Sequence, residues 1–122
     1  MAGIVFLKTK NLEKLKSYYS KIGAKVWIDQ TDCIIFKHDN FLFGFCERDS
    51  ISTGWLLTFF YKTKLEVDRM YEILNLGNKN ISPPVMNEKY KIYHFFTTDP
   101  EGRDIEFQVF LDKIDFNWKY EQ

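Results

Sequence analysis

The sequence predicts an α+β fold in which a β-α-β-β-β module occurs twice. Three observations support this prediction: strand and helix patterns follow the same order in both halves, a glycine follows each predicted helix, and a specific turn joins the last two strands. That turn is Asp99-Pro100-Glu101-Gly102, where Asp, Pro and Gly occupy positions that they favour in a type I turn. At 122 residues, the chain has the length of a single domain.

The first module is predicted over residues 1–48 and opens with a strand over residues 3–9. Asn11 is a good N-cap, and the apolar residues after it recur at helical spacing until Gly23 ends the helix. Turn-rich sequences separate the strands that follow. These three strands are predicted over residues 24–28, 32–37 and 41–46.

The second module is predicted over residues 54–110, and its first strand covers residues 55–61. Thr63 and Glu66 form a capping box that starts a second helix, and Gly77 ends this helix. At an offset of 53 residues, the two modules share several identities. The identical pairs are Phe6 and Phe59, Leu12 and Leu65, Glu13 and Glu66, and Tyr18 and Tyr71. Together with the shared element order, these pairs favour an internal duplication.

A loop over residues 78–87, with room for a short strand, leads to a closing hairpin over residues 90–110. Residues alternate between the two faces of the last strand. One face carries Arg103, Ile105, Phe107 and Val109, and the other carries Asp104, Glu106, Gln108 and Phe110. The first face is apolar enough to pack on a helix, and the second presents a carboxylate and an amide.

The composition excludes several classes of protein. Seventeen basic and seventeen acidic residues cancel, which leaves no electrostatic footprint for nucleic acid or an anionic membrane. Uncharged runs are too short to span a bilayer, and without a signal-peptide pattern at the N-terminus a cytoplasmic location is expected. The chain has two cysteines, Cys33 and Cys46, for which the sequence favours reduced thiols in strands over a disulfide.

Two segments, IVFLKTKNLEKLKSYY at residues 4–19 and FFTTDPEGRDIEFQ at residues 95–108, carry a resemblance to a known family. With the tandem modules, they resemble the vicinal oxygen chelate superfamily, which includes glyoxalase I, extradiol dioxygenases, fosfomycin-resistance enzymes and bleomycin-resistance proteins. The resemblance implies a curled mixed sheet that forms a cup around a ligand site. It also implies a homodimer.

Metal-dependent members of that superfamily place ligands on the first and last strands of each module. Carried over by resemblance, these positions fall on Ile4, Gly44, Leu57 (or Leu56 if the register shifts by one) and Glu106. A divalent ion needs several N or O ligands around it, and only Glu106 can supply one. The sequence therefore predicts neither a metal site nor a cofactor.

Strand alternation predicts which residues share a face with Glu106 and line the cup. Besides Leu42, Gly44 and Ile92, the expected ligand-binding residues are Ile4, Phe6, Trp55, Leu57, Phe59, His94, Phe96, Glu106 and Gln108. An apolar lining with a few polar groups is the usual constitution of a small-molecule pocket, but core filling is an equal alternative. Likewise, Glu106 could act as a general base or form a salt bridge, and a lone strand histidine such as His94 is usually structural.

The leading interpretation is a metal-independent small-molecule binding protein of the glyoxalase/bleomycin-resistance type, which holds an apolar or aromatic ligand. The alternative is a metal-free isomerase or lyase with Glu106 as general base and His94 as its partner, so the sequence leaves open whether the protein is an enzyme. A third alternative is an accessory protein with a vestigial cup. Residues 111–122 lie beyond the family pattern, and their alternating apolar residues suggest an extra strand that covers a sheet edge or reaches a partner.

Overall fold

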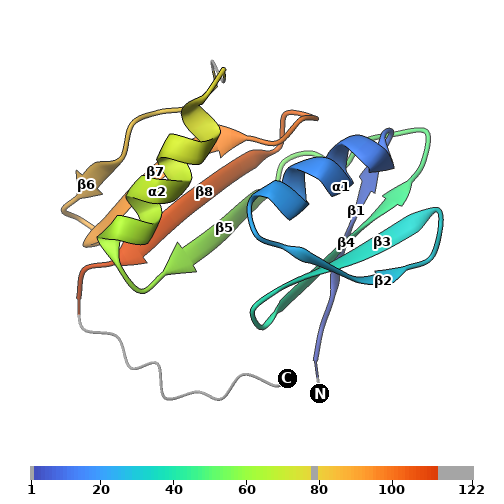
Figure 1. The fold of residues 1–122 in the computed structure, drawn as a ribbon, viewed down its shortest axis with the longest axis horizontal. Coiled ribbons are helices and arrows are strands. Elements are labelled where there is room, and N and C mark those ends of the chain that lie inside the picture. The colour runs from blue at the N-terminus through green and yellow to red at the C-terminus, as the bar shows by residue number, and fades with distance from the viewer. Residues whose placement is uncertain (1, 78–79, 113–122) are drawn as a thin grey trace. The chain divides into compact units, whose positions relative to one another are not determined.

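The structure of the protein is a computed structural model that describes residues 2–77 and 80–112. Its elements are β1 (Val5–Thr9), α1 (Leu12–Lys21), β2 (Lys25–Asp29), β3 (Cys33–His38), β4 (Phe41–Glu47), β5 (Leu56–Tyr61), α2 (Lys64–Asn75), β6 (Val85–Asn87), β7 (Ile92–Thr98) and β8 (Asp104–Phe110). The predicted α+β class and the repeated β-α-β-β-β order are confirmed (Figure 1). The extra strand suggested for the C-terminal tail falls on residues 113–122, outside the described residues.

The chain separates into two compact units, and the boundary lies between Thr53 and Gly54. The first unit contains a four-stranded sheet in the order β1-β4-β3-β2, with β1 parallel to β4 and the other pairs antiparallel. Helix α1 packs on one face of this sheet (Figure 1). The centroid of the Tyr19 ring in this helix lies 5.3 Å from that of Phe43 and 5.0 Å from that of Phe45, and all three side chains are buried. An aromatic cluster therefore forms this core.

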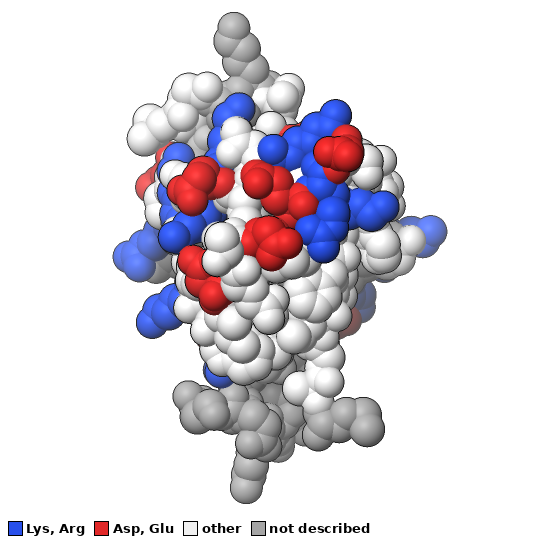
Figure 2. Space-filling model, turned by 90° about the vertical axis from the view of Figure 1, so that its right-hand side faces the viewer, with Lys and Arg blue, Asp and Glu red and all other residues white. Residues whose placement is uncertain are grey.

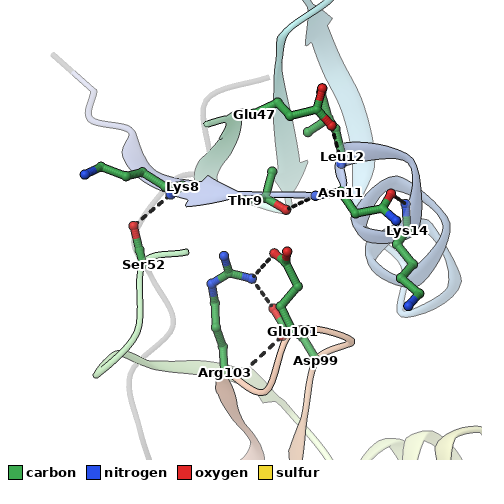
Figure 3. A network of polar contacts seen from close by, with 10 residues as sticks. All are labelled: Lys8, Thr9, Asn11, Leu12, Lys14, Glu47, Ser52, Asp99, Glu101 and Arg103. Carbon is green, nitrogen blue, oxygen red and sulfur yellow. Dashed lines mark hydrogen bonds and ion pairs between the residues drawn. The ribbon is translucent and has the colours of Figure 1, made fainter. Parts of the chain in front are cut away.

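Both helices begin where the sequence predicts. The Asn11 side chain accepts a hydrogen bond from the backbone N–H of Lys14 at 3.1 Å, and Thr63 accepts one from Glu66 at 3.2 Å. Figure 3 also shows the carboxylate of Glu47, at the end of β4, accepting from the backbone N–H of Leu12. These side chains satisfy backbone N–H groups that have no partner within the helix.

The prediction of reduced cysteines is wrong, because Cys33 and Cys46 form a disulfide. The two residues are direct partners on the antiparallel strands β3 and β4, with their Cα atoms 4.0 Å apart. The same register pairs His38 with Phe41 across a tight turn, in which Asp39 has a φ of 52°. The hairpin turn therefore determines which cysteines face each other.

The second unit repeats the plan, with a sheet in the order β5-β8-β7-β6 and β5 parallel to β8. Helix α2 packs against β5, β7 and β8, so this sheet has a helix-covered face and a helix-free face (Figure 1). The residues buried on the helix-covered face include Leu57, Phe59, Phe95, Ile105, Phe107 and Val109. The predicted alternation along β8 is therefore confirmed.

The predicted turn joins β7 to β8. The backbone N–H of Gly102 donates to the carbonyl of Asp99 at 3.0 Å, and Gly102 has a φ of 85°, which a side chain would disfavour. The Asp99 carboxylate accepts from the backbone N–H of Glu101 and from the Arg103 guanidinium, as Figure 3 shows. A second acceptor for the guanidinium is the Glu101 carboxylate at 3.0 Å.

No helix in the described part of the chain is long and apolar enough to cross a membrane. On the face drawn in Figure 2, the basic and acidic side chains are interspersed, and neither charge dominates that face.

Candidate functional site

The polar residues predicted for a ligand site come together on the helix-free face of the second sheet. Glu106 lies at the centre of this group, because Thr58 of β5 and Phe96 of β7 are its direct partners in the two neighbouring strands. His94 pairs with Gln108 in the same way, two residues further along β8. Since direct cross-strand partners project from the same face, all five side chains lie on the side opposite α2.

A chain of hydrogen bonds connects three of these side chains. The Thr58 hydroxyl donates to Oε1 of Glu106 at 2.8 Å, and Oε2 of Glu106 lies 2.6 Å from Nδ1 of His94. Only 7% of Glu106 and 8% of His94 is exposed, so this contact is a buried one. Such a buried polar group is stable in a folded protein only when it is hydrogen-bonded.

These contacts change the role that the sequence suggests for Glu106. Both of its carboxylate oxygens are already hydrogen-bonded to neighbouring side chains, Oε1 to Thr58 and Oε2 to His94. In contrast, Nε2 of His94 and the side-chain amide of Gln108 have no hydrogen-bond partner among the described residues. The structure therefore leaves the imidazole and the amide, rather than the carboxylate, with unused hydrogen-bonding capacity.

Apolar side chains surround this polar group on the same face. Phe96 packs edge-on against the His94 ring, with the ring centroids 4.9 Å apart. Phe60 and Phe110 pair in the same geometry at 5.6 Å. Four apolar residues of this face have exposed fractions between 36% and 51%: Leu56, Phe60, Phe96 and Phe110. We call these four residues the apolar rim.

Two of the predicted lining residues lie on the opposite face of the sheet, and a third lies outside its strands. Leu57 and Phe59 are buried on the helix-covered face, where the rings of Phe59 and Phe107 stack at 5.6 Å. Trp55 precedes β5 and is half exposed. The prediction of which β5 residues share a face with Glu106 is therefore wrong by one residue. Thr58, and not Leu57 or Phe59, lies beside Glu106.

The remaining candidates belong to the first unit. Phe6 pairs with Gly44, and both lie on the face of their sheet that is opposite α1. The Phe6 ring covers Gly44 so closely that a Cβ atom there would lie 2.7 Å from Cε1 of the ring. Half of Phe6 is exposed, as is 37% of Ile4, which lies just before β1.

The residues at the superfamily's metal-ligand positions do not fit a divalent ion. Ile4 and Leu56 are hydrocarbon, and Gly44 has no side chain and lies beneath the Phe6 ring. Glu106 is the one oxygen ligand of the set, and both of its oxygens contact other side chains. Within residues 2–77 and 80–112, no three His, Cys, Asp or Glu side chains lie close enough together to hold a metal ion.

Comparison with solved structures identifies the fold. A glyoxalase/bleomycin resistance protein/dioxygenase family enzyme from Burkholderia phytofirmans PsJN is 18% identical, with a TM-score of 0.74 over 87% of this chain and 95% of that chain. The fosfomycin resistance protein FosX from Listeria monocytogenes is 18% identical, with a TM-score of 0.75 over 89% and 92%. A bleomycin-binding protein, solved in complex with bleomycin, is 10% identical, with a TM-score of 0.69 over 89% and 98%.

These similarities confirm, at the level of fold, the predicted resemblance to the vicinal oxygen chelate superfamily. No protein-family model and no curated protein matches the sequence itself. Because one fold supports many activities, the function has to be argued from the residues of the site.

Proposed function

We propose that this protein binds a small molecule with an apolar or aromatic body, without a metal ion and without changing it chemically. The observation that carries the proposal is the helix-free face of the second sheet, where the apolar rim surrounds the side chains of Glu106, His94 and Gln108. Small-molecule sites commonly combine an apolar lining with a few polar groups that orient the ligand.

Two further points support binding over catalysis by a metal. The donor set at the superfamily's ligand positions does not fit a divalent ion, and the contacts of Glu106 leave neither oxygen free of a neighbouring side chain. The bleomycin-binding protein also gives a precedent for ligand binding on this fold. We further expect a homodimer, as the resemblance implies.

The test is a thermal-shift screen of aromatic metabolites and antibiotics, since a ligand that binds only the folded state raises the melting temperature. Each ligand found is then titrated against Glu106→Gln and against Glu72→Gln, which makes the same chemical change at an exposed position of α2. We expect a weaker affinity in the first variant and an unchanged affinity in the second. A screen in which no compound stabilises the protein would contradict the proposal.

A second candidate is a metal-free isomerase or lyase, which the 2.6 Å contact between Glu106 and His94 favours. A carboxylate that orients an imidazole is an arrangement used in proton transfer. Under this alternative, Glu106→Gln abolishes turnover of a ligand from the screen but leaves its affinity almost unchanged. Under the binding proposal, no ligand is turned over by the wild-type protein, so product analysis separates the two.

A further inference from the structure

We infer that Glu106 holds His94 in the tautomer with its proton on Nδ1, and that Nε2 accepts a hydrogen bond from a hydroxyl group of the ligand. The inference rests on the proposed function and narrows its ligand to an apolar or aromatic molecule with a hydroxyl donor. It also assigns separate roles to the two residues. His94 is the ligand contact, and Glu106 is a positioning residue.

The first step concerns the location of the imidazole proton. Oε1 of Glu106 accepts from the Thr58 hydroxyl, and Oε2 faces Nδ1 of His94 at 2.6 Å. An ionised carboxylate can only accept hydrogen bonds, so the proton in the second contact belongs to Nδ1. In a neutral imidazole, the hydrogen bond made by one nitrogen decides the state of the other. When His94 is neutral, Nε2 therefore carries a lone pair.

The second step concerns the surroundings of that lone pair. No described residue donates a hydrogen bond to Nε2, so this atom reaches the surface through the 8% of His94 that is exposed. The Phe96 ring packs edge-on against the imidazole and restricts its rotation. The side-chain amide of Gln108, the cross-strand partner of His94, also has no hydrogen-bond partner among the described residues and reaches the surface in the same way. Two unused polar groups thus lie side by side within the apolar rim.

The third step is the chemistry of a matching ligand. A lone pair on Nε2 requires a donor, and the apolar rim requires a hydrocarbon or aromatic body next to that donor. A hydroxyl group meets the first requirement, and it can also accept a hydrogen bond from the Gln108 amide. A site built around such a polar group discriminates against an analogue that lacks the donor, because the site's own group is then left unpaired.

The tautomer is tested in the ligand-free protein by long-range nitrogen–proton NMR of the imidazole rings. The chain has only two histidines, so His38→Phe and His94→Phe assign the two sets of signals by elimination. We expect His94 to show a protonated Nδ1 and an unprotonated Nε2. A proton on Nε2, in either the other tautomer or an imidazolium, would overturn the inference and would leave the proposed function untouched.

The ligand class is tested with matched pairs that differ by one methyl group and whose hydroxyl stays protonated at neutral pH: para-cresol with para-methylanisole, and β-naphthol with its methyl ether. We expect each hydroxyl compound to bind about tenfold more tightly than its ether, a difference of about 1.4 kcal/mol. In His94→Phe, which keeps an aromatic ring beside Phe96, the two members of each pair should bind equally. The preference should persist in Glu72→Gln.

Thr58→Val provides a second variant if His94→Phe does not fold, because Val has a similar shape to Thr but cannot donate to Glu106. The wild-type preference for the hydroxyl compound should decrease in this variant. The Glu106 carboxylate loses the hydrogen bond from Thr58 that helps to hold it in position beside His94. Equal binding of both members to the wild-type protein overturns the inference but supports the proposed function. Binding of neither member, while other aromatic compounds still stabilise the protein, also overturns the inference alone.

Discussion

The ion pair at the β7–β8 turn allows a quantitative prediction. The side chains of Arg103 and Asp99 are both 0% exposed, and Nη1 of Arg103 lies 3.0 Å from Oδ2 of Asp99. Replacing Arg103 with Met keeps most of the apolar stem but removes the buried guanidinium that pairs with the Asp99 carboxylate. Removing one partner of a buried ion pair costs about 3–5 kcal/mol, a large part of the roughly 5–15 kcal/mol that stabilises a typical domain.

The assay is urea denaturation of Arg103→Met, followed by circular dichroism, with the loss measured as a change in the midpoint at constant slope. Arg69→Met on the exposed side of α2 is the matched control and should change the free energy of unfolding by less than about 0.5 kcal/mol. A loss below about 1 kcal/mol in Arg103→Met would refute the reasoning, because the pair would then behave as a surface salt bridge.

Three other perturbations have expected outcomes. The hydrogen bond to the Asp68 carboxylate raises the pKa of Tyr93 to about 12. The stabilisation that this hydrogen bond gives to the folded protein should therefore be complete below the ordinary tyrosine pKa of 10.0, and it should disappear as the pH rises through about 12. Absorbance titration should show the Tyr93 transition at a lower pH in Asp68→Asn, and an unchanged titration curve would contradict this. Gly44→Ala should cost about 1–3 kcal/mol because the ring above it must move, whereas Gly3→Ala, with nothing within 4 Å, should be neutral in the same urea assay. Replacing both disulfide cysteines with Ser should cost about 3 kcal/mol, given a separation of 13 residues, and alkylation of the unreduced wild-type protein should find no free thiol.

The sequence predicts most of the fold because its local features agree with one another. The Asp99-Pro100-Glu101-Gly102 turn, the Asn11 cap and the Thr63 cap each specify one boundary, and the structure has all three. Alternation along β8 is equally clear, since charged or amide side chains occupy three of the four alternate positions, and the fourth is Phe110.

The phase of β5 fails for the opposite reason. WLLTFFY is apolar at every position except Thr58, so its sequence hardly distinguishes the two faces. An offset of 53 between the modules places Leu57 opposite Ile4, whereas Leu57 lies on the helix-covered face. In the structure, the N-caps of the two helices, Asn11 and Thr63, correspond to each other, which gives an offset of 52. The single polar residue of the segment, Thr58, is the one that faces Glu106.

The disulfide was predictable from the turn instead of from cysteine usage. A two-residue turn at Asp39 and Asn40 pairs His38 with Phe41, and counting outwards along both strands brings Cys33 opposite Cys46. The contacts of Glu106 were not predictable in this way. They depend on the side-chain rotamers of Thr58 and His94, which come from different strands and whose positions local sequence patterns do not determine.

The parallel pairing of β1 with β4, and of β5 with β8, has a consequence for folding during synthesis. In each sheet the last strand of the module lies between the first strand and the rest, so the first strand has no partner until the last one emerges from the ribosome. Closing such a long loop is entropically costly and slow. The first sheet can therefore form once Glu47 has emerged, while the second module is still being translated. A nascent chain that stops before β4 lacks Phe43 and Phe45, so Tyr19 of α1 and Phe36 of β3 would lose the two rings that pack against them.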